Sequence, residues 1–266
     1  MSQPPYPVAD KLFWRDPRFG GITAIVFGEM GAGKTTFLTN IALAMFKHDY
    51  IIWRGMFSAQ ALYYWPKEFQ LLVPDGFKLK VWNIDKRTPV NLEAYHFSNY
   101  EQMLDALEIN RLNVVFMPID MWKEFVSTLH KLWDRNAWLT LIFDEVEELC
   151  PPYAQGEDWR INERIAEAVK EYRKCWISFY CATQQPSDVD YRLRNKMMLR
   201  VYLKGAKKMS IERFRQELID NLEPGWAVVA GSFFEKFQYN ELRPARYRMR
   251  IRLVKEGVLP SIIHSF

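Results

Sequence analysis

Residues 28–35 read Gly28-Glu29-Met30-Gly31-Ala32-Gly33-Lys34-Thr35 and match the pattern G-x-x-x-x-G-K-[ST] in full. The β-branched, apolar run from Gly21 to Phe27 comes just before them and predicts a strand. Helix-forming residues from Thr35 to Lys47 come just after. A strand, a glycine-rich loop and a helix in this order are the setting in which the motif binds phosphate, so a chance glycine-rich turn is the weaker interpretation.

The same residues predict how a nucleotide is held. The glycines let backbone N–H groups converge on phosphate oxygens, and the helix N-terminus adds a favourable dipole. Lys34 is expected to reach the β- and γ-phosphates, and Thr35 to ligate Mg²⁺. The predicted cofactors are therefore ATP and Mg²⁺. The predicted nucleotide contacts are Gly28, Glu29, Met30, Gly31, Ala32, Gly33, Lys34, Thr35 and Thr36.

A second apolar strand, Trp138 to Phe143, runs directly into Asp144 and Glu145. Asp144 is predicted to bind the Mg²⁺ shell, and Glu145 to polarise a water for in-line attack on the γ-phosphate. A small-molecule kinase needs no such second carboxylate, because its substrate supplies the nucleophile. The pair therefore favours hydrolysis. The alternative is a solvated acidic turn, since two more glutamates follow at 147 and 148.

A third strand, predicted from Trp176 to Tyr180, continues into Cys181, Ala182, Thr183 and Gln184. Ligands of parallel sheets lie beyond the carboxyl ends of the strands. If this strand neighbours either of the other two, Gln184 faces the γ-phosphate or the attacking water, and its amide can donate to one and accept from the other. The alternative is that Gln184 only caps the strand end.

Strands alternate with helices along most of the chain, which predicts an α/β fold with a mostly parallel sheet, helices on both faces and a RecA-like P-loop NTPase core. The helices expected between the strands include Tyr100 to Ile109, Met121 to Trp133 and Arg160 to Lys174. After Arg192 the pattern changes to strands with one helix between them. We expect these strands, at 197–203, 226–234 and 247–254, to join the same sheet, with the helix at 211–222.

The predicted organisation is an extended N-terminal arm over residues 1–20, in which Phe13 and Trp14 dock on the body or on a neighbour, and a single ATPase domain over residues 21–266 with a basic, β-rich C-terminal part. A disordered tail is the alternative for the arm. The three cysteines, an odd number without a CxxC spacing, argue against disulfides and a zinc site and favour a reducing, cytoplasmic location. No apolar run is long enough to span a bilayer, so no membrane insertion is predicted.

The formal net charge of +4 conceals an uneven distribution. Residues 192–255 carry sixteen Lys and Arg against six Asp and Glu, so the rest of the chain is acidic. A basic C-terminal part suggests an anionic partner.

Within this part, four arginines alternate with apolar residues at positions 246, 248, 250 and 252 and are predicted to share one face of a strand. That face has three interpretations: it contacts a nucleic-acid backbone, it protects an edge strand, or it pairs with carboxylates of an adjacent subunit. Lys204, Lys207 and Lys208 form a second basic patch.

The phosphate loop, the strand ending in Asp144-Glu145, and Arg173-Lys174 followed by an apolar strand into Ala182-Thr183-Gln184-Gln185-Pro186-Ser187 together resemble the HerA/FtsK superfamily. These are ring-forming, DNA-pumping ATPases that include helicase-translocases, conjugation motors and viral genome-packaging ATPases. The sequence is also similar to the Zot-like morphogenesis ATPases of filamentous phages. The resemblance covers roughly residues 21–203, and the Arg-Lys and Thr-Gln-x-Pro-Ser elements are its more specific part.

The resemblance implies roles for individual residues. Lys34, Gln184 and Glu145 match catalytic positions, Thr35 and Asp144 match metal positions, and Arg173 matches an arginine presented to the neighbouring subunit's nucleotide. Arg192, Arg194 and Arg200 are lesser candidates for that arginine. The implied function is an ATP-driven motor that translocates or packages double-stranded DNA without sequence preference. The expected assembly is a homo-oligomeric ring with a hexamer as its size, encoded by a virus or plasmid. A Zot-like virion assembly ATPase and a nucleotide-dependent DNA-binding module that does not pump are the alternatives; the absence of a membrane segment disfavours the former.

Overall fold

The computed structural model describes Leu12, residues 20–134 and residues 136–257. Phe13, Trp14 and nearly all of the predicted N-terminal arm lie outside the described residues. Leu12 is buried, and its backbone carbonyl accepts a hydrogen bond from the Tyr180 hydroxyl. Among the described residues, no helix combines the length and the apolar character that a bilayer crossing requires.

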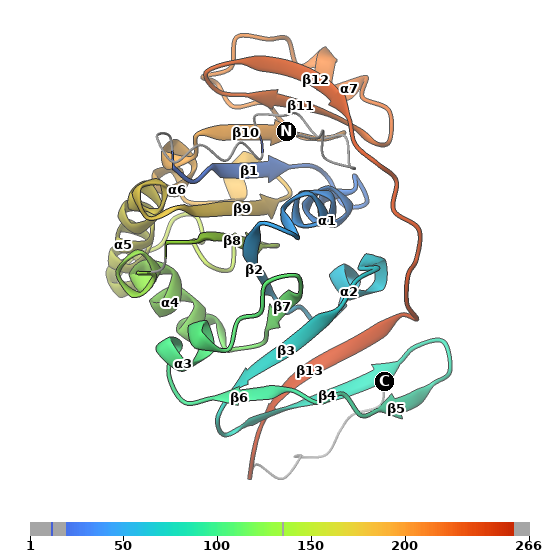
Figure 1. The fold of residues 1–266 in the computed structure, drawn as a ribbon. Helices are drawn as coiled ribbons and strands as arrows, with labels where there is room; N and C mark the ends of the chain where they lie inside the picture. Colours follow the sequence, from blue (N-terminus) through green and yellow to red (C-terminus); the bar gives the residue numbers. More distant parts are fainter. Residues whose placement is uncertain (1–11, 13–19, 135, 258–266) are drawn as a thin grey trace.

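The first half of the chain alternates strands with helices and then adds four short strands (Figure 1). Its elements are β1 (Thr23–Phe27), α1 (Lys34–Met45), β2 (Asp49–Arg54), α2 (Gln60–Tyr64), β3 (Phe69–Pro74), β4 (Phe77–Asn83), β5 (Thr88–Val90), β6 (Tyr95–Phe97), α3 (Tyr100–Asp105), β7 (Leu112–Val115) and α4 (Ile119–Leu132). The second half contains β8 (Trp138–Phe143), α5 (Gly156–Tyr172), the 3₁₀ helix η2 (Arg173–Cys175), β9 (Ile177–Thr183), η3 (Pro186–Asp188), α6 (Tyr191–Lys196), β10 (Leu199–Tyr202), α7 (Glu217–Asp220), β11 (Trp226–Ala230), β12 (Phe234–Gln238) and β13 (Met249–Lys255).

Ten strands form one sheet in the order β12-β11-β10-β1-β9-β8-β2-β7-β3-β6. Every pair from β10 to β6 is parallel, whereas β11 and β12 add an antiparallel hairpin at the other end. The predicted α/β fold with a mostly parallel sheet and additional C-terminal strands is therefore confirmed. Because the central strands are buried on both faces, they read in the sequence as continuous apolar runs.

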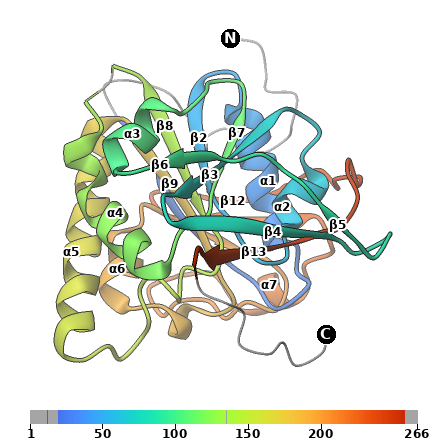
Figure 2. The same cartoon turned by 90° about the horizontal axis from the view of Figure 1, so that it is seen from below.

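Helices cover both faces of this sheet (Figure 2). On one face, α4 and α5 pack through Phe125, Leu129, Ile165 and Val169. On the other face, α1 and α2 pack beside a second, three-stranded sheet of order β13-β4-β5. The prediction that the last strand joins the main sheet is wrong. Strand β13 instead pairs antiparallel with β4, because its apolar residues Met249 and Ile251 match the apolar side of that strand.

Two other expectations for the C-terminal part need correction. The predicted helix over 211–222 is limited to α7, because side chains bond the preceding backbone: the Gln216 amide accepts from the Lys208 N–H at 2.9 Å and donates to the Ala206 carbonyl at 2.8 Å. The predicted strand over 226–234 is a hairpin. It turns at Gly231, where a Cβ atom would lie 2.6 Å from the Met198 carbonyl oxygen.

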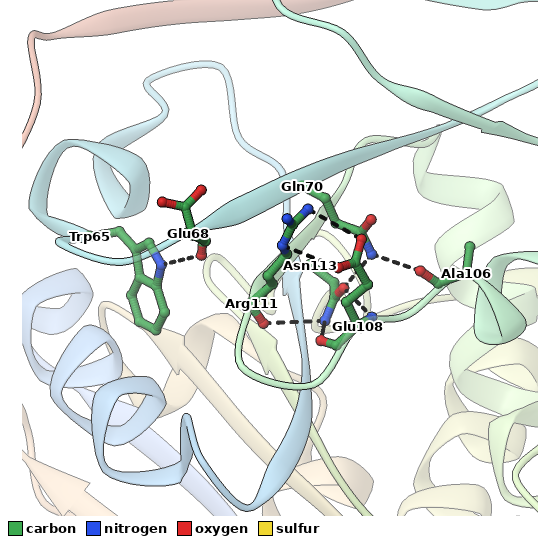
Figure 3. A network of polar contacts seen from close by, with 7 residues as sticks. All are labelled: Trp65, Glu68, Gln70, Ala106, Glu108, Arg111 and Asn113. Atoms are coloured by element: carbon green, nitrogen blue, oxygen red, sulfur yellow. Dashed lines mark hydrogen bonds and ion pairs between the residues drawn. The ribbon is translucent and has the colours of Figure 1, made fainter.

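A buried amide ties together the half of the sheet that carries β3. Asn113 of β7 donates to the carbonyl of Ile51 at 2.8 Å. It also donates to the carbonyl of Glu108 at 3.1 Å and accepts from the Gln70 amide and the Glu108 N–H (Figure 3). Asn113 is fully buried, so its amide oxygen and nitrogen find all of their partners within the protein. The network joins β2, β3 and β7 with the turn that precedes β7.

Replacing Asn113 with alanine is expected to lower the free energy of unfolding by about 2–4 kcal/mol, because several buried polar groups lose their partners at once. Chemical denaturation followed by circular dichroism measures the effect. Asn91→Ala removes an exposed amide and is the matched control, with an expected change within about 0.5 kcal/mol. Equal stability of the two variants would show that the network does not stabilise the sheet.

Candidate active site

The three strand ends singled out in the sequence meet at one edge of the main sheet. Strand β9 lies between β1 and β8, with Phe27 paired to Thr183 and Phe143 paired to Cys181. The phosphate loop, the Asp144-Glu145 pair and the Thr183-Gln184 segment therefore leave adjacent parallel strands at their carboxyl ends. Residues from all three line a cavity of about 440 Å³.

The phosphate loop turns through two glycines with left-handed backbone, Gly31 at φ 80° and Gly33 at φ 92°. Gly33 precedes the first residue of α1, so the helix N-terminus faces the cavity. The Lys34 ammonium donates to the carbonyls of Gly28 at 2.8 Å and Glu29 at 3.1 Å, which folds its side chain back over the loop. Burial lowers the pKa of Lys34, although the carboxylates of Asp144, Glu147 and Glu145 oppose that shift. The loop thus combines N–H donors and a cation at one point, as an anionic phosphate requires.

The Thr35 hydroxyl donates to the Asp144 carboxylate at 2.7 Å, which joins the start of α1 to the end of β8. Among the described residues, no group of three or more His, Cys, Asp or Glu side chains is arranged to hold a metal ion. The Thr35 hydroxyl and the Asp144 carboxylate fit Mg²⁺ at a nucleotide site, because Mg²⁺ is held by one or two protein oxygens together with phosphates and waters. Thr35 and Asp144 are the residues that would hold it, and the ion would neutralise charge on the phosphates.

Glu145 has a backbone conformation that non-glycine residues rarely adopt, with φ at 56°. Its N–H donates to the Asp144 carboxylate at 3.1 Å. Partial burial raises the pKa of Glu145, and the charges of Asp144 and Glu148 raise it further, whereas Arg54 and Lys34 lower it. A raised pKa brings the carboxylate closer to the range in which a general base accepts a proton from water.

Arg54, at the end of β2, holds this unusual backbone in place. Its guanidinium donates to the carbonyls of Asp144 at 3.0 Å and Glu145 at 3.3 Å, and it forms an ion pair with Glu148. It also stacks on the Phe143 ring, with 4.6 Å from Cζ to the ring centroid. The side chain is only 8% exposed. Arg54 was not among the predicted site residues. The sequence signal that could have indicated it is a single arginine at the end of the apolar run Tyr50-Ile51-Ile52-Trp53.

Glu147 is a third carboxylate at the cavity; in the sequence it only supported the alternative of a solvated acidic turn. It is partly buried, and burial together with the charges of Glu145 and Asp144 raises its pKa. Beyond the carboxylates, the cavity extends between the end of β2 and α2. Its lining there includes the large apolar or aromatic side chains of Trp53, Met56, Tyr64, Val114 and Phe116, together with Ser58 and Gln60. The cavity is thus polar at the phosphate loop and more apolar farther away.

The structure separates the two neighbouring glutamines. Gln184 is exposed and lines the cavity, and its carbonyl accepts a hydrogen bond from the Gly28 N–H at 3.1 Å. Gln185 points away, with its amide bonded to the Gly205 carbonyl at 3.0 Å and the Lys207 N–H at 2.8 Å. Gln184 is therefore the direct neighbour of the residue that bonds the basic segment 204–208, so a movement of Gln184 can be passed to that segment.

Arg173 is not brought to this cavity. It is exposed and lies at the amino end of β9, where its carbonyl accepts from the Gly21 N–H at 3.0 Å, so the length of the strand separates it from the phosphate loop. Of the lesser candidates, Arg192 is bonded to Asp190 and stacks on Trp159, and Arg200 is paired with Glu212. Arg194 is partly buried.

Solved structures share this fold. The genome packaging NTPase B204 from Sulfolobus turreted icosahedral virus 2, in complex with ATPγS, matches with a TM-score of 0.53 and 12% identity, over 87% of this chain and 100% of that chain. The pCW3 conjugation coupling protein TcpA, in monomer form with ATPγS, matches with a TM-score of 0.50 and 11% identity, over 88% of this chain and 69% of that chain. These structures confirm the predicted likeness at the level of the fold, and at 11–12% identity the fold is what they establish.

The N-terminal domain of zonular occludens toxin from Neisseria meningitidis matches with a TM-score of 0.38 and 11% identity, over 84% of this chain and 95% of that chain. That score is too low to support the Zot-like alternative. No protein-family model and no curated protein matches the sequence.

Tyr239, which follows β12, packs against the phosphate loop. Its hydroxyl donates to the Ala32 carbonyl at 3.2 Å and lies 2.6 Å from the position that a Cβ at Gly33 would occupy. At Gly31, whose φ is also positive, a Cβ would meet nothing within 4 Å. Gly33 is therefore required for space as well as for conformation.

Gly33→Ala is expected to cost about 2–4 kcal/mol of stability, from left-handed strain and from the clash with the Tyr239 hydroxyl. Gly31→Ala is the control that introduces strain without a clash and is expected to cost about 1–2 kcal/mol. In a Tyr239→Phe background, Gly33→Ala should cost about 1 kcal/mol less, because the hydroxyl is gone. Denaturant unfolding of wild type, Gly33→Ala, Tyr239→Phe and the double variant measures this coupling. Additive effects would mean that the Tyr239 hydroxyl does not restrict the side chain at residue 33.

Proposed function

We propose that this protein hydrolyses ATP and uses the energy to move DNA. The observation that carries the hydrolytic part is the arrangement around Asp144 and Glu145: Thr35 and Asp144 are joined at 2.7 Å, and Arg54 fixes the backbone of Glu145 beside them. Two oxygens suited to Mg²⁺ and a carboxylate of raised pKa thus lie at the same phosphate loop, which supports the proposal. Such a set serves attack by water on a γ-phosphate.

The residues divide the chemistry between them. The phosphate loop and Lys34 bind the phosphates and neutralise their charge, while Thr35 and Asp144 hold Mg²⁺. Glu145 accepts the proton of the attacking water, so that the γ-phosphoryl group is transferred to that water and ADP leaves. Gln184, at the same cavity, hydrogen-bonds the γ-phosphate or the water, so its contacts change when the phosphate leaves.

DNA is the proposed partner on two grounds. Two solved structures of the same fold are, by their names, a genome packaging NTPase and a conjugation coupling protein. In addition, residues 192–255 carry a large excess of Lys and Arg, which suits a polyanion bound through its backbone. We therefore propose packaging or transfer of a viral or plasmid genome as double-stranded DNA.

The proposed working form is a homo-oligomeric ring, with a hexamer as the expected size. Arg173 supports it, because this exposed arginine lies at the edge of the sheet opposite to the phosphate loop and cannot serve its own nucleotide. Presented to a neighbouring subunit, it would stabilise the charge of the transition state there and make hydrolysis depend on the neighbour. A monomeric mass by light scattering in the presence of ATP and DNA would contradict the ring.

Glu145→Gln is expected to retain ATP binding and to lower the hydrolysis rate by about 100-fold or more, because the water loses its base. Lys34→Ala should weaken both binding and hydrolysis. Phosphate release and nucleotide titration measure the two quantities, and Glu101→Gln, on α3, is the matched control. Wild-type turnover in Glu145→Gln would refute the assignment and would favour a nucleotide-dependent DNA-binding module instead.

Arg54→Gln is expected to lower kcat by about tenfold or more, or ~1.4 kcal/mol, with little change in nucleotide affinity. The pH profile is the decisive readout. Glu145 must be ionised, so activity falls as the pH drops through its raised pKa; removing the positive charge of Arg54 raises that pKa further, and the acid limb should move to higher pH. Arg54→Lys keeps the charge but not the two carbonyl contacts, so it should lose kcat with a smaller shift of the limb. An unmoved limb in Arg54→Gln would leave Arg54 with a role in folding only.

A further inference from the structure

The second sheet, β13-β4-β5, is assembled from distant parts of the chain and lies beyond α2 at the lower right of Figure 1. Strand β13 pairs with β4 along its whole length, from Met249 opposite Asn83 to Lys255 opposite Phe77. Residues directly opposite each other in such a pair point to the same side of the sheet. The register therefore determines which side chains share its outer face.

The inner face of this sheet is apolar and packs on the main body. Val81, Met249 and Ile251 are buried there, and Leu79 and Leu253 pack against the same core. The outer face alternates with it and is exposed and basic. Four cations occupy that face, with Arg252 opposite Lys80, Arg250 opposite Trp82, and Lys78 two residues before Lys80.

The pairing corrects the predicted arginine face. Only Arg250 and Arg252 belong to the strand, because β13 begins at Met249. Arg248 is bonded to Asp85, and Arg246 is bonded to the Lys67 carbonyl and stacks on the Phe69 ring. The other two cations of the face are Lys78 and Lys80 of the neighbouring strand β4. Their pairing with β13 could not be predicted from the sequence.

These four cations are not explained by folding. Within the described part of the chain, Lys78, Lys80 and Arg252 form no ion pair, and the recorded contact of the Arg250 guanidinium is with the Phe57 ring, at 5.7 Å. Like charges directly opposite, as Arg252 and Lys80 are, destabilise a sheet. Protection of an edge would account for single cations on either strand, but it does not account for a lysine placed directly opposite an arginine, as Lys80 is opposite Arg252.

We propose that this outer face, the basic face formed by Lys78, Lys80, Arg250 and Arg252, binds the phosphate backbone of duplex DNA; the inference rests on the proposed function above. Residues two apart on a strand are spaced by about 6.6 Å, close to the ~7 Å between successive phosphates of one DNA strand. Duplex DNA carries one charge per about 1.7 Å of axis, twice the density of a single strand, so a rigid row of cations releases more counterions on duplex. With only Lys and Arg as charged groups, the face binds without reading sequence.

The basic face is also attached to the nucleotide cavity. The Ile251 N–H donates to the Phe57 carbonyl at 2.9 Å, and the Arg250 guanidinium lies over the Phe57 ring. Phe57 belongs to the segment that follows Arg54, and its neighbours Met56 and Ser58 line the cavity. The strand that carries Arg250 and Arg252 is therefore bonded to the same short segment that forms one wall of the proposed ATP site.

The test is the salt dependence of duplex binding, measured without nucleotide by fluorescence anisotropy of a mixed-sequence 30-bp DNA probe, at several NaCl concentrations. The slope of log affinity against log salt should fall by about 0.9 per phosphate contact removed, hence by about 1.8 for Arg250→Gln/Arg252→Gln, by the same for Lys78→Gln/Lys80→Gln, and by about 3.6 for all four. The inner face is untouched and like charges are relieved, so the variants should unfold no earlier than wild type. Lys170→Gln/Lys174→Gln, exposed on α5 and η2, removes the same charge and should leave the slope unchanged.

The outcomes are distinct. If wild type binds duplex and neither double variant changes the slope, the basic face is not the DNA site, while the proposed function stands. If wild type binds no duplex at all, the proposed DNA motor fails with it. Binding only to a single-stranded probe, with about 0.7 lost per contact, would overturn the duplex assignment. Loss of oligomer mass in the variants, with DNA binding intact, would instead make this face a contact with acidic groups of a second copy.

Discussion

Arg54 links two neighbouring strands through the backbone that the proposed chemistry depends on. Its guanidinium bonds the carbonyls of Asp144 and Glu145 while it is almost completely buried against Phe143. A non-glycine residue with φ near 56° is strained by roughly 1 kcal/mol or more, so some other group must hold it there. In this fold the parallel order of β2, β8, β9 and β1 brings that group, the carboxylates and the phosphate loop to one edge. The geometry of the site thus follows from strand order.

Local signals in the sequence predicted the parts of the site that are local. The phosphate loop, the strand ending in Asp144 and Glu145, and the strand ending in Thr183 and Gln184 each carry their chemistry within a few residues, and the structure places all three at one cavity. Arg54 and Tyr239 were missed because their contacts, with the Asp144-Glu145 backbone and with the phosphate loop, are made with residues far away in the chain. The same reason explains the wrong position of β13, whose alternating pattern fixes which residues share a face but not which strand it joins.

The C-terminal part shows how a charge count can mislead. Its arginines do different things: Arg192 and Arg200 form ion pairs within the fold, and Arg246 and Arg248 hold the segment that leads into β13. Arg250 and Arg252 are exposed on β13, and two lysines of β4, from the other half of the chain, share their face. The net charge of a segment therefore suggested the kind of partner, whereas register and ion pairing determine which cations can meet it.

The most direct test of the account is the rate of ATP turnover by the full chain with and without duplex DNA. The account predicts hydrolysis that requires Mg²⁺ and rises severalfold when duplex DNA is added, because a motor couples its cycle to its track. Turnover that is present but identical with and without DNA, in a preparation shown to bind DNA, would contradict the motor and leave an ATPase with another task. Absence of hydrolysis under all of these conditions would contradict the assignment of Glu145 itself.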